Sequence, residues 1–206
     1  SIIDQNNLEE FESNAFASAN VAIEFTTPQT AADNILRAWK AGVPVVCGTT
    51  GWDVSEFRIK NYELRGDGIG LMWSSNYSIG VNILFALNRQ LAKFMEEYPE
   101  YTPHMTEVHH IHKLDAPSGT ALMLGRAVQS VRPEAVFNLG RSGMGKRTRE
   151  EIGFHAIRRG NVPGIHEVSV STDTQAITLR HEVYDRALFA DGALSAVRFL
   201  AGKTPG

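Results

Sequence analysis

VAIEFTTPQTAADNILRAWKAGVPVVCGTTG, residues 21–51, decides the fold class, because it predicts a strand, a helix and a second strand in succession. VAIEFT (21–26) is a short, β-branched apolar run, which is typical of a strand buried in a parallel sheet. Residues 29–42 carry apolar side chains at helical spacing and end at Gly42, so we expect a helix there. PVVCGTTG (44–51) predicts the next strand and a turn. Because strand and helix alternate, a parallel α/β sheet is expected.

The segments on either side extend this pattern. Residues 54–66 predict a helix, and the apolar run IGLMWSSN (69–76) predicts a third strand. Residues 78–98 carry one apolar stripe at helical spacing and predict the longest helix of the chain. At the front, SIID (1–4) is typical of the middle of a strand and not of the start of a domain, and we therefore expect a chain whose front has been removed.

Beyond residue 77 the pattern changes. MTEVHHIHKL (105–114) predicts a strand and PSGTALMLGRAVQSV (117–131) predicts a helix. Residues 152–184 alternate apolar and polar side chains between Gly and Asp turns, as antiparallel strands do. We therefore place a domain boundary near Tyr77.

Composition narrows the class of protein. The chain has 206 residues, of which 43% are hydrophobic and 21% charged, and its net charge is −3. This balance predicts neither nucleic acid nor an anionic membrane as a partner. No apolar run reaches the roughly 18 residues that a membrane span needs, and the acidic start is unlike a signal peptide. The single cysteine, Cys47, excludes an internal disulfide, so we expect a cytoplasmic protein.

The stretch EVHHIHKLDAPSGTA (107–121) concentrates the chemistry of the second half. In an extended strand, His109 and Lys113 would share one face, and His110 and His112 the other. A polar strand at a sheet edge is one interpretation. A zinc site is another, but no cysteine lies nearby and Lys113 would repel a cation.

The turn after the histidines favours a third interpretation. Pro117 is tolerated in a first helical turn, and Ser118 or Thr120 can satisfy free backbone N–H groups there. Gly119 lets a ligand approach the backbone, and a helix start binds carboxylate or phosphate oxygens. With imidazoles and an ammonium group beside it, the stretch indicates a proton-transfer site for a small, multiply negative substrate. A plain strand, turn and helix remains the alternative.

Small polar residues also follow each predicted strand of the first half. Gly48–Gly51 follows the second strand, Thr26–Pro28 the first, and Ser74–Tyr77 the third. Ligands of α/β sheets bind where parallel strands end, so these three turns together indicate a nucleotide crevice. Each turn alone is weak evidence.

Residues 140–147 contain a partial phosphate-loop motif. GRSGMGKR (140–147) fits the first seven positions of G-x-x-x-x-G-K-[ST], but Arg147 stands where Ser or Thr would hold magnesium. Loop and strand, not a helix, are expected to follow. We interpret the segment as a mobile basic loop that attracts anions or as a solvated run of charges; its cations are Arg141, Lys146, Arg147 and Arg149.

HHIHKLDAPSGTA (109–121), GTTGW (48–52) and SSNYSIGVN (74–82) together resemble the dihydrodipicolinate reductase family, also called 4-hydroxy-tetrahydrodipicolinate reductase. The resemblance covers essentially the whole chain, and the first of these signatures is long and specific. It implies an α/β fold: a Rossmann-like parallel-sheet domain, here truncated at its N-terminus, and a mixed-sheet α+β domain. The implied domains are a partial dinucleotide-binding domain (1–77), a substrate-binding and oligomerisation domain (78–186), and a segment that returns to the first domain (187–206).

The resemblance also implies an activity and roles for residues. Family members use NADH or NADPH to reduce a cyclic dicarboxylate at C4 with loss of a hydroxyl as water, and are usually homotetramers. The catalytic positions are His109 and Lys113. The substrate-binding positions are His110, Ser118, Gly119 and Thr120. The cofactor-binding positions are Asp4, Gly48, Thr49, Thr50, Ser74, Ser75, Asn76, Tyr77 and Arg186. No metal is implied.

One departure concerns the cofactor. The family's G-x-x-G-x-M-G turn, which cradles the pyrophosphate, does not occur here. Roughly 30 residues, about one βαβ unit, would then precede Ser1 in the family pattern. If SIID is the second strand of the fold, Asp4 falls near the adenosine ribose and favours NADH weakly over NADPH. We therefore expect this chain to bind dinucleotide poorly.

Three other functions stay open. The first is another two-domain NAD(P)-dependent reductase, such as a relative of aspartate or homoserine dehydrogenase. The second is a non-catalytic scaffold that binds anions. The third is a zinc hydrolase that uses His109, His110 and His112.

Overall fold

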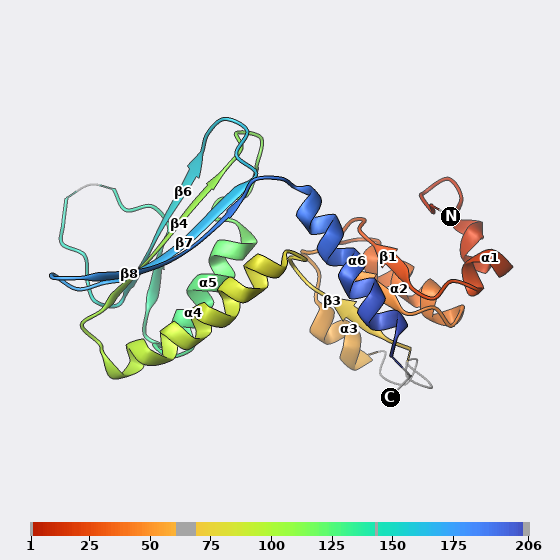
Figure 1. Cartoon of the computed structure of the whole chain (residues 1–206), viewed down its shortest axis with the longest axis horizontal. Helices are drawn as coiled ribbons and strands as arrows, with labels where there is room; N and C mark the ends of the chain where they lie inside the picture. Colours follow the sequence, from red (N-terminus) through yellow and green to blue (C-terminus); the bar gives the residue numbers. More distant parts are fainter. Residues whose placement is uncertain (1, 61–68, 143, 204–206) are drawn as a thin grey trace. The chain divides into compact units, whose positions relative to one another are not determined.

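The computed structural model describes residues 2–60, 69–142 and 144–203. The chain divides into two compact units. Unit 1 comprises Ser1–Tyr77 and Leu188–Gly206, and unit 2 comprises Ser78–Ala187. Figure 1 shows the order of their elements along the chain. Within the described residues, no helix combines the length and the apolarity that crossing a membrane would require.

Unit 1 is built on a short parallel sheet. Its elements in chain order are the 3-10 helix η1 (Leu8–Glu12), α1 (Asn14–Ala17), β1 (Ala22–Glu24), α2 (Ala31–Lys40), β2 (Val45–Cys47), α3 (Val54–Lys60), β3 (Leu71–Trp73) and α6 (Ala187–Ala201). The strand order is β1-β2-β3, and both pairings are parallel. The three predicted strands and the two helices between them are confirmed; the part of the predicted helix 54–66 after residue 60 lies outside the described residues.

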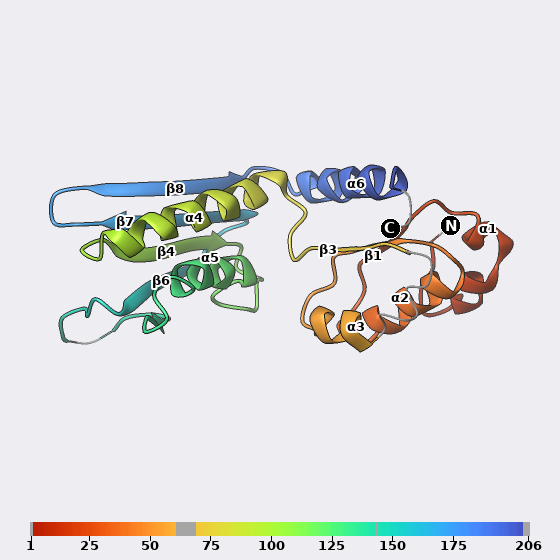
Figure 2. The same cartoon turned by 90° about the horizontal axis from the view of Figure 1, so that it is seen from below.

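Helices cover both faces of this sheet. Val45 and Cys47 of β2 pack with α2 and α3, whereas Val46 between them packs with α6. Figure 2 shows α6 on one side of the strands and α2 and α3 on the other. Because successive side chains of a strand point to opposite faces, a strand covered in this way must be apolar throughout. All three residues of β2 are buried accordingly.

The predicted strand at the start of the chain is wrong. Among the described residues, Ile2, Ile3 and Asp4 belong to no strand, and a turn follows in which the Asn7 side chain accepts the backbone N–H of Asp4 at 2.7 Å. A strand needs a neighbour for its backbone N–H and C=O groups. The described sheet pairs only β1, β2 and β3, so this segment has no neighbour there.

Unit 2 is a mixed sheet with two helices. Its elements are α4 (Ile79–Glu97), β4 (Thr102–His109), α5 (Gly119–Gln129), β5 (Val136–Asn138), β6 (Glu151–Arg158), β7 (Gly164–Ser171) and β8 (Ala176–Val183). The strand order is β5-β6-β4-β7-β8, so β4 is central. It runs parallel to β6 and antiparallel to β7, with Glu107 opposite His166.

Helices α4 and α5 lie over the same face of the five-stranded sheet (Figure 2). Their buried side chains pack on alternate residues of three strands, including Met105, Ile152 and Val168. The buried Asn88 side chain of α4 donates to the Leu124 carbonyl of α5 at 2.8 Å and ties the helices together. The catalytic candidates of β4 therefore belong to a well-packed layer.

Candidate active site

Strand β4 ends at His109, and this determines how the histidine stretch is arranged. The predicted strand 105–114 is therefore wrong beyond His109. The neighbouring strand stops too, and Gly160 turns its chain with a φ of 51° that suits glycine. Without a partner strand the backbone folds into a turn, in which the Lys113 N–H donates to the His110 carbonyl at 3.2 Å. His109 and Lys113 consequently lie on different elements.

A buried carboxylate organises this end of the sheet. Glu107 is 1% exposed, and its Oε1 accepts hydrogen bonds from the Ser118 backbone N–H at 2.9 Å and from Arg158 Nη2 at 2.8 Å. The same Arg158 nitrogen donates to the Asp115 carbonyl. Glu107 thereby links β4, β6 and the turn before α5. Glu107 and Arg158 were not among the predicted site residues, although Glu107 is two positions before His109 on a predicted strand and must share its face.

Two imidazoles share the other oxygen of this carboxylate. Glu107 Oε2 lies 3.4 Å from His109 Nδ1 and 3.7 Å from His166 Nε2. The two rings meet edge to face with centroids 5.0 Å apart. His166 Nε2 also lies 3.2 Å from the Ser118 hydroxyl. His166 comes from β7 and was missed, because only the antiparallel pairing of β4 and β7 brings it to Glu107.

Burial lowers the pKa of both histidines, so both are neutral near pH 7. It lowers the pKa of His109 to about 4, with the cations Lys113 and Arg158 acting in the same direction and Glu107 opposing them. Burial likewise lowers the pKa of His166 to about 4, and the neighbouring His109 adds to the effect. Burial alone would raise the pKa of Glu107, but its hydrogen bonds from Ser118 and Arg158 outweigh this and hold that pKa below the ordinary value.

The turn between β4 and α5 presents a cation. Lys113 Nζ lies 2.7 Å from Asp115 Oδ1, and the lysine side chain is 23% exposed. His110 is half-buried and His112 is exposed, with ring centroids 6.2 Å apart. This part of the site is therefore open to solvent and positively charged at Lys113, beside the two buried and neutral imidazoles.

Helix α5 begins at this turn with unused donors. The Ser118 hydroxyl caps the helix by accepting the Ala121 N–H at 3.2 Å. The N–H groups of Gly119 and Thr120 donate to nothing within the described part of the chain. A Cβ on Gly119 would meet no atom within 4 Å, so open space lies before this helix start. The arrangement can accept an anionic oxygen.

The turn Gly48–Gly51, which follows β2, is held in place by the aromatic residues around it. The Thr49 carbonyl accepts the indole N–H of Trp52 at 2.9 Å and of Trp73 at 2.8 Å. Thr49 itself is buried, and its hydroxyl accepts the Thr26 N–H at 2.8 Å. Gly48 is half-buried and Thr50 exposed. This turn therefore joins the ends of β1, β2 and β3 into one edge, which is the part of a parallel sheet where ligands commonly bind.

The segment after β3 closes the same edge. The Tyr77 hydroxyl lies 2.8 Å from the Cys47 carbonyl and 2.9 Å from the Met72 carbonyl. Burial raises the pKa of Tyr77, so the phenol stays protonated and anchors the end of the sheet. The half-buried members of the segment are Ser74, Ser75 and Asn76. Their backbone and side-chain polar groups remain candidates for contact with a nucleotide.

A second buried carboxylate lies at this edge of unit 1. Glu24 is 6% exposed, accepts the Cys47 thiol at 2.9 Å and is bonded by the Thr26 hydroxyl. Burial, reinforced by Glu24, raises the pKa of the Cys47 thiol to about 12. The single cysteine of the chain is consequently an inert core residue.

The two remaining cofactor candidates, Asp4 and Arg186, belong to other segments of the chain. Asp4 sits in the N-terminal turn, where its carboxylate accepts the Asn6 N–H at 2.7 Å. Arg186 is exposed between β8 and α6, at the end of unit 2. Neither is brought to the ends of β1–β3 by contacts within its own unit.

The described residues of the basic segment, 140–142 and 144–147, belong to no helix or strand, and the strand β6 follows them as predicted. Two of its basic residues, Arg147 and Arg141, already have partners within the protein. Arg147 donates to the carbonyls of Pro103 and Glu151, and Arg141 lies 3.6 Å from the Glu151 carboxylate. The expectation that these two attract anions is therefore wrong, because they fasten the loop to the sheet.

Glu107, His109 and His166 lie close enough to surround a cation, since their donor atoms fall within 4.8 Å of one another. Arg158 already pairs with Glu107 at 2.8 Å, and the nearby Lys113 adds a second positive charge. These charges oppose a dication. The set differs from the predicted zinc alternative, whose His110 and His112 face elsewhere.

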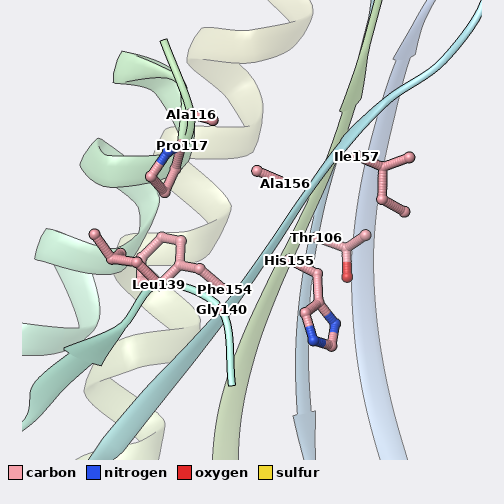
Figure 3. A pocket seen from close by; sticks show the side chains of 9 residues that line it. All are labelled: Thr106, Ala116, Pro117, Leu139, Gly140, Phe154, His155, Ala156 and Ile157. Carbon is pink, nitrogen blue, oxygen red and sulfur yellow. The ribbon is translucent and has the colours of Figure 1, made fainter. Parts of the chain in front are cut away.

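A pocket of about 350 Å³ lies beside the site, at the edge of β6 beyond the short pairing with β5. Figure 3 shows the residues that line it, among them Ala116 and Pro117 at the entry to α5. Its polar side chains are Thr106 and His155 alone. We assign the chemistry to the histidine cluster because the charged groups gather there.

A two-domain α/β chain, with a Rossmann-like parallel sheet in one unit and a buried histidine and carboxylate cluster in the other, has the plan expected of a nicotinamide-dependent oxidoreductase. Comparison with known proteins narrows this class. Residues 4–77 match the family described as Dihydrodipicolinate reductase, N-terminus, and residues 80–206 match Dihydrodipicolinate reductase, C-terminus. The chain belongs to the dihydrodipicolinate reductase family.

Individual relatives agree with this assignment. The 4-hydroxy-tetrahydrodipicolinate reductase of Methanopyrus kandleri is 38% identical over 94% of this chain and 70% of its own length. That of Ruegeria pomeroyi is 41% identical over 93% of this chain and 71% of its own length. The dipicolinate-bound dihydrodipicolinate reductase of Paenisporosarcina sp. TG-14 shares the fold with a TM-score of 0.72 at 23% identity, over 97% of this chain and 74% of that one.

Proposed function

We propose that this chain reduces 4-hydroxy-tetrahydrodipicolinate to tetrahydrodipicolinate with a nicotinamide nucleotide, in diaminopimelate and lysine biosynthesis. Family membership supports the reaction class. The observation that carries the proposal is the cluster in unit 2, where neutral imidazoles, the Lys113 ammonium group and the open start of α5 lie together. A small dicarboxylate that takes up a proton during reduction needs all three.

Substrate binding is assigned to the turn and the helix start. The free N–H groups of Gly119 and Thr120 and the positive end of α5 favour a carboxylate. His110, half-buried and on the same turn, adds a donor. Ser118 acts differently from the others, because its backbone N–H and its hydroxyl are already engaged by Glu107 and by the cap of α5. Ser118 therefore shapes the carboxylate site and leaves direct contact to its neighbours.

Proton transfer is assigned to His109 and Lys113. Replacing a hydroxyl by hydride releases water, so the reaction consumes one hydride and one proton. When bound, the reduced nicotinamide supplies the hydride. Lys113 carries a proton that it can give to the departing oxygen. His109, with a pKa near 4, is neutral before substrate arrives, and the negative charge of a dicarboxylate raises that pKa toward the working range.

Cofactor binding is assigned to the edge of unit 1 formed by Gly48, Thr49, Thr50 and the segment 74–77. Its parallel strands end in small polar residues, which fits a dinucleotide. Tyr77 supports this edge through its carbonyl contacts, and Asp4 and Arg186 are assigned more weakly. We propose NADH over NADPH on the position of Asp4 in the family pattern alone, because in the structure its carboxylate lies in the N-terminal turn and not on a strand of the sheet. Titration with both nucleotides tests this choice, and tighter binding of NADPH would reverse it.

A cytoplasmic homotetramer is proposed as the working form, on the family resemblance. The face of the five-stranded sheet opposite α4 and α5 carries Ile157, which is 43% exposed, among polar side chains. Native mass spectrometry of the purified chain measures the assembly directly, and a monomer at micromolar concentration would contradict it.

Calorimetric titration with pyridine-2,6-dicarboxylate, with NADH present, tests the substrate site. We expect saturable binding to the wild type. Gly119→Ala places a methyl group in the open space before α5 without meeting any atom, so it should weaken binding at least tenfold and leave stability unchanged. Gly202→Ala, remote from the site in sequence and unit, is the matched control. No binding to the wild type, or equal binding to both variants, would overturn the assignment.

A further inference from the structure

We infer that Glu107 is a positioning residue for His109, which it holds so that Nδ1 faces the carboxylate and Nε2 is the nitrogen that works on the substrate. The inference deepens the proposed function and rests on it for the role of His109. It assigns Glu107, which the family signature in the sequence did not point to, and it selects one of the two ring nitrogens.

Two unpartnered atoms carry the inference. Glu107 Oε2 and His109 Nδ1 are both buried, and within the described residues neither has a hydrogen-bond partner. They face each other at 3.4 Å. Buried polar atoms are almost always satisfied in proteins. A shift of about half an ångström closes an N–H···O bond between them, and nothing else in the described part of the cluster competes for the imidazole proton.

Glu107 is itself held firmly enough to orient another side chain. Its Oε1 receives the Ser118 N–H and the Arg158 guanidinium at 2.9 and 2.8 Å. With two donors on one oxygen, the carboxylate cannot rotate, so Oε2 stays aimed at the rings. Arg158 also neutralises the charge, and this lets a carboxylate that is 1% exposed remain ionised.

His166 does not take the place of His109 at this oxygen. Its Nε2 lies 3.7 Å from Glu107 Oε2 but 3.2 Å from the Ser118 hydroxyl, which is the nearer partner. The groups that face His109 are thus Glu107 from β4, His166 from β7, Arg158 from β6, and Lys113 with Asp115 from the turn. Glu107 is the acceptor among them that lies within reach of Nδ1.

The other ring nitrogen is left accessible. Nδ1 of His109 is buried, whereas Nε2, which has no hydrogen-bond partner within the described residues, keeps contact with solvent. Gly164 lies beside it, and a Cβ there would come within 3.3 Å of Nε2. The absence of a side chain at Gly164 therefore preserves space on the working side of the ring.

Glu107→Gln tests the inference, because the amide keeps the size of the side chain and an oxygen for Ser118 and Arg158 but loses the charge. We expect kcat for the reduction to fall at least tenfold, with KM and the dissociation constant of pyridine-2,6-dicarboxylate changed by less than about threefold. Glu167→Gln is the matched control: Glu167 is on β7, on the opposite face, and pairs with the exposed Arg180. It should leave all three constants unchanged.

Nitrogen-15 NMR of the histidine side chains gives a readout that does not depend on turnover. In the wild type at neutral pH, we expect the proton of His109 on Nδ1. In Glu107→Gln that tautomer should no longer dominate, and Glu107→Asp should recover it in part. Loss of the carboxylate should also lower the pKa of His109 further, because Glu107 is the strongest group raising it.

The outcomes separate the two hypotheses. A wild type that reduces the substrate, beside a Glu107→Gln variant equal to it in kcat and tautomer, overturns the inference. A wild type with neither dicarboxylate binding nor reduction overturns the proposed function, while the NMR tautomers still decide whether Glu107 holds His109. If Glu107→Gln does not fold, a wild-type His109 protonated on Nε2 would overturn the inference by itself.

Discussion

The pH dependence of stability follows from the burial of His166. Its pKa is about 4 in the folded protein against an ordinary value of 6.5. Between these two pH values the unfolded chain binds a proton on this ring and the folded chain does not. The stability contributed by the neutral form is fully present above about pH 6.5 and is lost as the pH falls toward 4. At about pH 5, protonation of this one group shifts the folding equilibrium about 30-fold toward the unfolded state relative to neutral pH. This lowers the free energy of unfolding by about 2 kcal/mol.

The perturbation is His166→Asn, which removes the titrating ring and keeps a side chain able to bond the Ser118 hydroxyl. Urea unfolding is followed by far-UV circular dichroism at about pH 7.5 and about pH 5. The loss of stability between these conditions should be about 2 kcal/mol smaller in the variant than in the wild type. His112→Asn, at an exposed position of the turn, should keep the wild-type difference.

The chain offers an internal control for this assay. The three tryptophans are Trp39, Trp52 and Trp73, and all belong to unit 1. Tryptophan fluorescence therefore reports unit 1, and its response to His166→Asn should be small. An equal loss of stability on acidification in the wild type and in His166→Asn would refute the reasoning, because it would mean that His166 titrates alike in the folded and unfolded states.

Three further outcomes are expected. In a version that also carries the family's Gly-rich front segment, His109→Ala and Lys113→Ala should each lower kcat about a hundredfold or more in a steady-state reduction assay. His110→Ala should mainly raise KM. Rates within about fivefold of wild type for the first two variants would contradict the catalytic roles. Arg132→Met should lower the free energy of unfolding of unit 2 by about 2–4 kcal/mol in urea. The buried guanidinium donates to the carbonyls of Met95 in the last turn of α4, of Tyr98 at its C-terminal end and of Tyr101 beyond it. The same change at the exposed Arg126 should have no effect. Gly192→Ala would place a Cβ 1.7 Å from the Tyr77 carbonyl oxygen, so the free energy of unfolding of unit 1, measured by tryptophan fluorescence, should fall by at least about 2 kcal/mol. In Gly202→Ala the nearest atom to the new Cβ would be 3.6 Å away, and this variant should behave as wild type.

The buried parallel strands were predictable because their signal is local. VAIEF and PVVC are apolar on both faces, and the helix between them ends at Gly42, whose φ of 77° only glycine adopts without strain. The short elements η1, α1 and β5 were not foreseen, since three to five residues show too little periodicity to stand out.

The candidate site was predictable in part for the same reason. His109, Lys113 and the Pro-Ser-Gly-Thr turn are contiguous, so their residue types alone indicated proton transfer and anion binding. Where β4 ends depends on Gly160, some fifty residues later, and no local pattern contains that information. The partners Arg158 and His166 were hidden likewise, because strand pairing brings them to Glu107.

The order of strands in unit 2 has a consequence for how the protein is made. Ribosomes deliver β4 well before β6 and β7, and the central strand must wait for both neighbours. Until Arg158 emerges, 51 positions after Glu107, that carboxylate has no counter-ion and cannot be buried at low cost. Closing such distant pairs is slow relative to helix formation. The cluster of Glu107, His109 and His166 is therefore among the last parts of unit 2 to assemble. A nascent or truncated chain that stops before β7 exposes an incomplete sheet, in which His109 lacks its neighbour His166.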